Sequence, residues 1–137
     1  MNADCIFCKI INGEAACYRI YEDKYTLAFQ DVSNDVEGHT LVVPKKHFEN
    51  ILDCDEETLS QVMKTVQAVS THFTENCGYD GINILNANKE AAQQSVFHLH
   101  FHIIPRKKKD KIDAWITANM QENEKNSLEK LCEKLKL

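Results

Sequence analysis

The spacing of apolar residues along the chain predicts three helices. The first runs from Cys5 to Gly13, and the longest from about Asp55 to Asn76, where apolar side chains recur on one helical face. We expect Asp53, with Glu56 after it, to cap the start of the long helix, and a glycine to follow its end. The third, an amphipathic helix near the carboxyl terminus, would pack on the sheet or on another subunit. Its apolar positions are Leu128, Leu131, Cys132 and Leu135.

Runs of β-branched or alternating residues predict five strands. They lie at residues 18–21, 25–29, 39–43, 81–85 and 96–104. Most connections between them are too short for the crossovers that parallel strands require. We therefore expect an α+β fold with a mainly antiparallel sheet of about five strands, one central long helix and a C-terminal helix.

Composition excludes several classes of function. The chain has 137 residues and a formal net charge of −5, so it lacks the broad basic face of a general nucleic-acid binder. No apolar run approaches the ~20 residues that cross a membrane. Met1–Asp4 is not a basic segment followed by an apolar stretch, so we expect no secretory signal. We expect a cytoplasmic protein whose six cysteines are thiols or metal ligands rather than disulfides.

Three histidines alternate within the last predicted strand. His98, His100 and His102 would share one face, because side chains in a strand point alternately to its two sides. The opposite face would carry the core residues Phe97, Leu99, Phe101 and Ile103. This pattern fits three interpretations: histidines on a solvent-exposed strand face, a catalytic zinc site, and nucleophilic catalysis by an imidazole.

The cysteines divide into a close pair and four scattered residues. Cys5 and Cys8 form a C-x-x-C pair, which is typical of zinc ligands or of a redox centre. No thioredoxin-like strand precedes it, and a pair of buried thiols is the remaining interpretation. The others show no ligand spacing and are expected to be small buried or partly buried residues. They are Cys17, Cys54, Cys77 and Cys132.

Several blocks of sequence carry a resemblance to a known family. The His-x-His-x-His run at 98–102 is similar to the motif of the histidine-triad (HIT) nucleotide-binding proteins, as are residues 6–11, 28–32 and 38–47. The chain most resembles the zinc-containing bacterial members. The resemblance extends from Cys5 to about Arg106. It implies one domain over 1–137, with a core at 1–106 and a divergent segment at 107–137, where Trp115 and the last helix would shape leaving-group choice.

The resemblance implies the roles of the catalytic residues. His100 would attack the α-phosphorus and form a nucleotidyl-histidine, which water then hydrolyses. His98 would flank this nucleophile, while His102 and His39 would lie around the nonbridging phosphate oxygens. Ser95 would donate a hydrogen bond to the departing atom.

The resemblance also implies the ligands of a substrate and of a metal. Apolar residues would enclose a purine, and one carboxylate would bind the ribose hydroxyls. The substrate-binding residues are Ile6, Phe7, Ile10, Phe29, Asp31, Val32, Asn88, Gln94 and Ser95, with Leu41 as a weaker match. A structural zinc ion would be held by Cys5, Cys8, His47 and His98.

The loop before the histidine motif departs from the family pattern. Many members have asparagine at the position of Ala87, and glycine at those of Lys89 and Gln93, so the loop backbone and the activity are open to change. Asn86 or Asn88 would then take over the asparagine's role.

Our first functional hypothesis is hydrolysis of purine nucleoside phosphoramidates by a homodimer. The alternatives are a dinucleoside polyphosphate hydrolase, a zinc-stabilised nucleotide-binding module with little turnover, and a catalytic zinc hydrolase. The basic run 106–109 is expected to be a solvated turn, and it would steer a polyphosphate if it lay near the site.

Overall fold

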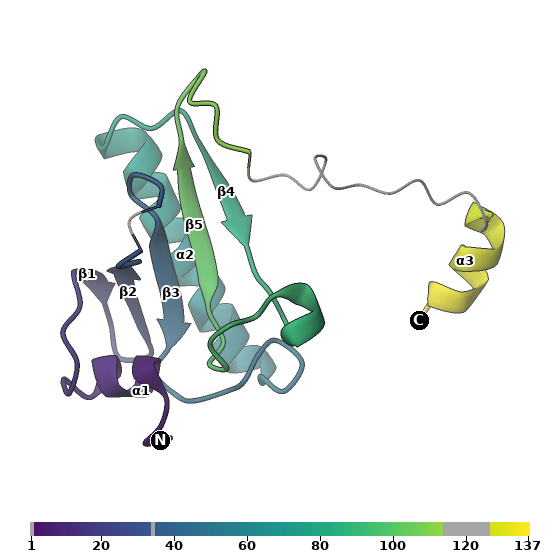
Figure 1. The fold of residues 1–137 in the computed structure, drawn as a ribbon, viewed down its shortest axis with the longest axis horizontal. Helices are drawn as coiled ribbons and strands as arrows, with labels where there is room; N and C mark the ends of the chain where they lie inside the picture. Colours follow the sequence, from purple (N-terminus) through teal and green to yellow (C-terminus); the bar gives the residue numbers. More distant parts are fainter. Residues whose placement is uncertain (1, 34, 114–126) are drawn as a thin grey trace.

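The computed structural model describes residues 2–33, 35–113 and 127–137. Its centre is one antiparallel sheet of five strands in the order β1-β2-β3-β5-β4 (Figure 1). The strands are β1 (Arg19–Glu22), β2 (Thr26–Gln30), β3 (Thr40–Pro44), β4 (Gly81–Leu85) and β5 (Phe101–Arg106). The helices are α1 (Ile6–Ile11), α2 (Glu56–Asn76) and α3 (Leu128–Leu135), with a 3₁₀ turn at Glu90–Ala92. The predicted α+β class is confirmed.

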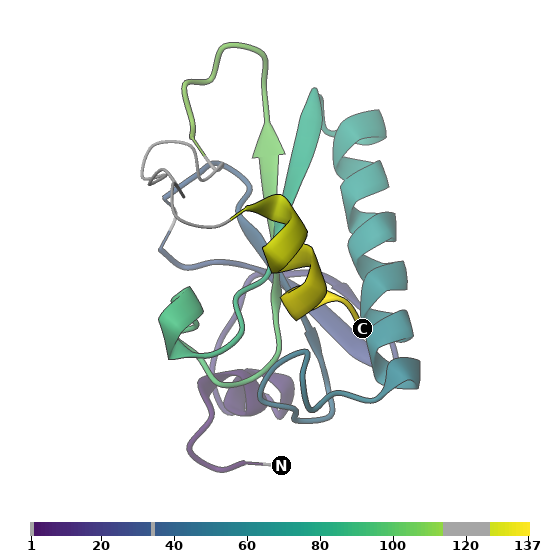
Figure 2. The same cartoon turned by 90° about the vertical axis from the view of Figure 1, so that its right-hand side faces the viewer.

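The two faces of the sheet are covered by different helices. Figure 2 shows α2 running along one side of the sheet. There Val62, Val66 and Phe73 pack with Ala28 and Val42 in one buried cluster. Because neighbouring strand residues face opposite sides, the adjacent positions of β2 and β3 pack with α1 instead. This second cluster includes Phe7, Ile10, Leu27, Phe29, Leu41 and Val43.

The residue that caps the long helix lies two residues later than predicted. The Asp55 carboxylate accepts a hydrogen bond from the Thr58 N–H at 2.7 Å and caps α2. The prediction for Asp53 was wrong, because its oxygens accept from the N–H groups of Glu49 and Asn50. Asp53 therefore closes the turn before the helix, and a carboxylate occupied in this way is not free to cap it.

The last predicted strand was too long at its start. β5 begins at Phe101, and residues 96–100 lie outside it. The Leu99 N–H donates to the Phe48 carbonyl at 2.7 Å, so this segment bonds to the loop after β3 rather than to β3 itself. Phe97, predicted in the core, is 47% exposed, whereas Leu99 and Ile103 are buried as predicted.

The C-terminal helix is present as α3, which Ser127 caps by accepting from the Lys130 N–H at 3.2 Å. None of its side chains is buried, so the predicted packing on the sheet is not found in the described structure. Trp115 lies outside the described residues. No helix in the described ranges is long and apolar enough to cross a membrane.

Candidate active site and metal centre

Three of the predicted catalytic histidines lie together on the α1 face of the sheet. His100 directly precedes β5, His102 lies on β5, and His39 directly precedes β3. β3 and β5 are neighbours, with Leu41 paired to His102. The ring centroid of His102 is 4.9 Å from that of His100 and 5.1 Å from that of His39. The antiparallel pairing thus joins histidines that are far apart in sequence.

One hydrogen bond fixes the proton on the His100 ring. Its Nδ1 lies 2.7 Å from the carbonyl oxygen of His98. A carbonyl oxygen only accepts, so Nδ1 carries the hydrogen and Nε2 of the neutral ring keeps a lone pair. Burial lowers the pKa of His100, which favours the neutral ring. His100 therefore offers an unprotonated nitrogen as a nucleophile or base.

His39 bridges a carboxylate and a second histidine. Its Nδ1 lies 2.7 Å from an Asp35 oxygen and 3.6 Å from an Asp31 oxygen. Its Nε2 lies 2.9 Å from the Nδ1 of His102. Burial lowers the pKa of His102 to about 4, so this ring is neutral near pH 7. Sequence reasoning missed Asp35, whose only signal was its place four residues before His39.

A cavity of about 280 Å³ opens beside these rings. The rings of Phe7 and Phe29 meet edge to face, with centroids 5.5 Å apart, and give it aromatic walls. Most of the predicted substrate-binding residues line it, together with two of the histidines. These predicted lining residues are Ile6, Phe7, Ile10, Phe29, Asp31, Val32, Leu41, Ser95, His100 and His102. The cavity also takes in Ala16, Cys17, Gln30 and Val96.

Gln94 and Asn88, two predicted substrate ligands, do not line this cavity. The buried Gln94 amide accepts from the Lys89 N–H at 2.8 Å and donates to the carbonyls of Glu49 and Val96. The Asn88 oxygen accepts from the Ile51 N–H at 2.8 Å. Both side chains therefore tie the loop before the histidine motif to the loop after β3.

Asn86 ties the same loop to the nucleophile. Its amide donates to the backbone carbonyl of His100 at 2.9 Å and accepts from the Asn88 amide at 2.5 Å. The two asparagines beside Ala87 thus form a continuous link to His100. The backbone of Lys89 and Gln93 has φ of 75° and 70°, so both positions keep the left-handed region that favours glycine.

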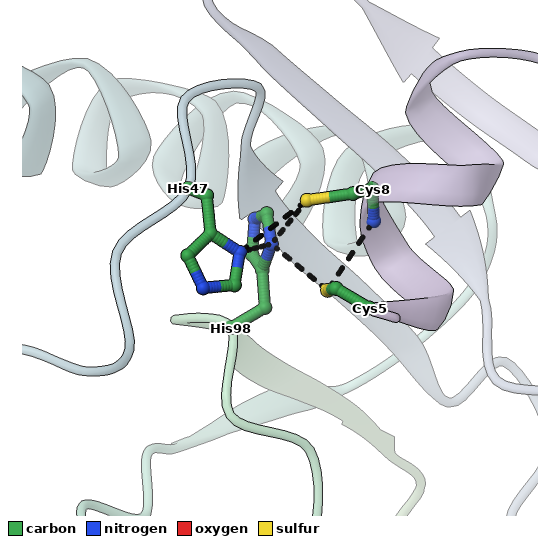
Figure 3. Close-up of side chains that lie close together, drawn as sticks. All are labelled: Cys5, Cys8, His47 and His98. Carbon is green, nitrogen blue, oxygen red and sulfur yellow. Dashed lines mark hydrogen bonds between the residues drawn. The ribbon is translucent and has the colours of Figure 1, made fainter. Parts of the chain in front are cut away.

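A second cluster lies beside Phe7, whose ring centroid is 5.9 Å from that of His98, and contains all four predicted zinc ligands. Figure 3 shows Cys5 and Cys8 at the start of α1 facing His47 and His98. Their ligand atoms all lie within 4.8 Å of one another. The Cys8 sulfur is 3.3 Å from the His47 Nδ1 and 3.5 Å from the His98 Nδ1, and these nitrogens are 3.1 Å apart.

The cluster has the chemistry of a tetrahedral metal site. Zinc bond lengths of about 2.3 Å to sulfur and 2.0–2.1 Å to nitrogen place tetrahedral ligands roughly 3.3–3.8 Å apart. The separations of 3.1–3.5 Å between the ligand atoms of Cys8, His47 and His98 are close to this range. The His98 Nε2 donates to the Pro44 carbonyl at 2.8 Å, so the Nδ1 lone pair faces the sulfur atoms. Burial lowers the pKa of His98 to about 4, which keeps that lone pair available.

The remaining cysteines and the basic turn lie elsewhere. All six cysteines are free thiols. Cys77 and Cys132 are exposed, which corrects the prediction that they are at least partly buried. Cys77 follows the last turn of α2, and Cys132 lies on α3, none of whose side chains is buried. Arg106 makes a two-pronged ion pair with Asp110, and the turn at 106–109 lies at the far end of β5 from His102.

Comparison with known proteins gives the family of this chain. The family model described as HIT domain matches residues 12–109, and the chain belongs to the HIT family. An uncharacterised HIT-like protein of Borreliella burgdorferi is 47% identical over 78% of each chain. The adenosine 5′-monophosphoramidase of Saccharomyces cerevisiae is 36% identical over 78% of this chain and 65% of its own.

A solved structure extends the comparison to metal. The zinc-bound histidine triad protein of Mycobacterium smegmatis is 37% identical, has a TM-score of 0.76 and aligns over 81% of each chain. The family, the fold and the relatives together support a nucleotide hydrolase of the general HIT type.

Proposed function

We propose that the protein hydrolyses purine nucleoside phosphoramidates through a covalent intermediate on His100. The observation that carries this proposal is the hydrogen bond from the His100 Nδ1 to the His98 carbonyl at 2.7 Å. It leaves the Nε2 lone pair on a ring that lines the cavity. The phosphoramidase of Saccharomyces cerevisiae, 36% identical, supports the same class of substrate.

The reaction follows from the placement of the side chains. The His100 Nε2 forms a bond to the α-phosphorus while the bond from phosphorus to the amine nitrogen breaks. Ser95, which lines the cavity, donates a hydrogen bond to the departing nitrogen, and the amine takes up one proton from solvent as it leaves. Water then attacks phosphorus, the bond from phosphorus to His100 breaks, the proton that the water loses returns to solvent, and the nucleoside monophosphate is released. His102 lines the cavity, where it would face the charge that develops on the nonbridging oxygens, and His39 would act behind it through their 2.9 Å contact.

The cavity accounts for the nucleoside. Phe7 and Phe29 provide flat apolar walls for a purine. One Asp31 oxygen accepts from the Ser33 N–H at 2.9 Å, and the carboxylate as a whole lines the cavity, where it accepts from ribose hydroxyls. No side chain of the basic turn 106–109 lines this cavity, so the geometry favours a phosphoramidate over a dinucleoside polyphosphate.

We further propose that Cys5, Cys8, His47 and His98 hold a structural zinc ion. The zinc-bound neighbour and the donor set support this assignment. Four protein ligands make a closed site, which stabilises a fold and leaves no position for substrate. The site would join α1 to the segment that carries the His98 carbonyl, and so would steady the nucleophile.

We also propose that the protein is a homodimer. β4 is an edge strand, and its Ile84 and Leu85 are 42% and 37% exposed. An exposed apolar edge is a natural pairing surface between two copies. Sedimentation equilibrium tests this, and a monomer at micromolar concentration would contradict it.

Hydrolysis of adenosine 5′-phosphoramidate tests the proposed reaction, with a diadenosine polyphosphate as the rival substrate. We expect faster release of the monophosphate from the phosphoramidate, and a loss of about a thousandfold in His100→Ala. His72→Ala is the matched control, because His72 lies on the exposed side of α2. Full activity of His100→Ala, or faster cleavage of the dinucleotide, would contradict the proposal.

Metal analysis tests the zinc site separately. We expect one zinc per chain in the purified protein and much less in Cys8→Ser. A chelator should lower the unfolding temperature first and the activity slowly afterwards. Immediate loss of activity that returns with added zinc would point to a catalytic metal instead.

A further inference from the structure

Asp35, His39 and His102 form a continuous chain of side chains that ends in the cavity. The Asp35 oxygen lies 2.7 Å from the His39 Nδ1, and the His39 Nε2 lies 2.9 Å from the His102 Nδ1. His102 lines the cavity, and its ring lies 4.9 Å from that of His100. Asp35 itself is absent from the cavity lining, so it acts only through the two rings.

The Asp35 carboxylate, at one end of this row of hydrogen-bonded side chains, determines which ring nitrogens carry a hydrogen. An ionised carboxylate only accepts, so the His39 Nδ1 carries a hydrogen. The hydrogen bond from His39 also lowers the pKa of Asp35, which keeps the carboxylate ionised. One hydrogen then lies between the His39 Nε2 and the His102 Nδ1, and its position decides what the last nitrogen of His102 presents to the cavity.

Adding one proton to this chain turns His102 into a donor. In the neutral chain His102 donates from Nδ1, and its Nε2 carries a lone pair that repels a phosphate oxygen. With one more proton His39 donates from both nitrogens, the His102 Nδ1 accepts, and the His102 Nε2–H points to the substrate. In this second form the Asp35 carboxylate accepts from the positively charged His39 ring across the 2.7 Å contact.

Asp31 does not replace Asp35 in this position. Its nearer oxygen lies 3.6 Å from the His39 Nδ1, beyond hydrogen-bond distance. Asp31 also lines the cavity, where the proposed function gives it the ribose hydroxyls. The groups that face His39 are therefore Asp35 at bonding distance, Asp31 further away, and the two histidines at the start of β5.

The loop that carries Asp35 also contacts the rest of the protein through Glu37 and Gly38. The Tyr79 hydroxyl donates to the Glu37 carboxylate at 2.9 Å, and the Lys107 ammonium lies 3.5 Å from the same carboxylate. Gly38 follows, with φ of 78° and Pro105 against it. These contacts involve residues 37 and 38, and the Glu37 carboxylate bonds to Tyr79 and Lys107 rather than to Asp35, His39 or His102.

We propose that Asp35 is a positioning residue that orients His39 and through it makes His102 a hydrogen-bond donor to the transferred phosphoryl group. This inference rests on the proposed function, since it assigns a role within the same phosphoryl transfer. Asp35 is exposed on its outer side, so water weakens its charge, and we expect an effect on the order of tenfold.

The kinetic test compares Asp35→Asn with Glu37→Gln in the zinc-loaded full chain. Both variants remove one carboxylate charge from the same loop, but only the first touches His39. We expect kcat for adenosine 5′-phosphoramidate to fall about tenfold in Asp35→Asn with KM within about twofold, because the donor acts on developing charge. Glu37→Gln should stay within about twofold of the wild type in both constants.

A spectroscopic test addresses the ring directly. Long-range ¹⁵N–¹H correlation spectra of the ligand-free protein should show a protonated Nδ1 on His39 in the wild type and in Glu37→Gln. In Asp35→Ala the same nitrogen should show a mixture of the two tautomers. An unchanged spectrum in Asp35→Ala would overturn the inference, because His39 would then be oriented without Asp35.

The two proposals fail in different ways. If the wild type does not turn over the phosphoramidate, or if His100→Ala keeps its activity, the proposed function is refuted and the catalytic role of Asp35 falls with it. If turnover depends on His100 but Asp35→Asn has the kcat of Glu37→Gln, only the role of Asp35 is refuted.

Discussion

Replacing Lys89 by glycine should stabilise the protein. Lys89 has φ of 75° and ψ of 164°, a combination that is open almost only to glycine. The backbone is held there because the Lys89 N–H donates to the Gln94 amide oxygen at 2.8 Å and its carbonyl accepts from the Gln94 N–H at 3.1 Å. The side chain is exposed, so glycine removes strain at the cost of little packing.

The expected gain is a difference between two effects. A side chain in this backbone region costs of order 1–3 kcal/mol. Glycine loses about 0.5–1 kcal/mol more conformational entropy on folding than other residues. We therefore expect Lys89→Gly to raise the free energy of unfolding by about 1 kcal/mol, and the melting temperature by roughly 3–5 °C in a chain of this size.

Gln93 supplies an internal comparison. Its φ of 70° and ψ of 27° lie in the ordinary left-handed region, which costs a side chain only about 1 kcal/mol. The entropy cost of glycine offsets most of this, so Gln93→Gly should change stability by less than about 0.5 kcal/mol. Lys89→Ala should give no gain either, because alanine keeps a Cβ atom in the strained region.

Urea unfolding followed by circular dichroism measures these differences. An increase in the midpoint with an unchanged slope in Lys89→Gly would show a change in stability rather than in the unfolded state. The reasoning is refuted if Lys89→Gly is no more stable than Lys89→Ala. It is also refuted if Gln93→Gly gains as much as Lys89→Gly, because then the backbone region would not set the magnitude.

Two further predictions concern the loop and the histidines. Gly38→Ala should lower the free energy of unfolding by about 2–3 kcal/mol in urea titrations, because its Cβ would lie 2.9 Å from the Pro105 ring carbon at a φ of 78°; wild-type stability would contradict this. The pKa of about 4 for His102 in the folded protein lies below the ordinary 6.5. The contribution of His102 to the free energy of unfolding is therefore complete above pH 6.5 and is lost as the pH falls toward 4. Between pH 7 and pH 5 the wild type should lose about 1 kcal/mol more stability than His102→Gln, after allowance for solvent screening, and equal losses would disprove this.

The sequence predicted those parts of the fold that depend on periodicity. α2 agrees with its pattern because one stripe of it is buried, and β2 and β3 agree because their apolar runs are buried on both faces of the sheet. β4 also lies where it was predicted, although none of its residues is buried. Residues 96–100 also alternate, and so they were predicted as strand. Alternation did not give the burial of this segment, because Phe97 is exposed whereas the consecutive residues His98, Leu99 and His100 are buried, and it does not report which segment supplies the hydrogen bonds. Here that segment is the loop at Phe48, which only the folded chain brings to Leu99.

The residues of the candidate site could be predicted where they belong to a recognisable sequence motif. The four proposed zinc ligands come from three segments, and the structure brings all four together. Asp35 was not predictable, because a carboxylate in an irregular loop has no periodicity that would aim it at His39. Asn88 and Gln94 were predicted to bind substrate and do not line the cavity. Their amides bond instead to backbone groups that only the packed loops place beside them.

The metal cluster and the nucleophile share one short piece of chain. The His98 ring faces the cysteines and donates from Nε2 to the Pro44 carbonyl, while the His98 carbonyl accepts from the His100 Nδ1. A rotation about the side-chain bonds of His98 alone would leave this carbonyl in place, whereas a shift of the His98 backbone would move both the ring and the carbonyl. Occupancy of the metal cluster should therefore act on the tautomer of His100 by holding the His98 backbone, through geometry rather than through charge.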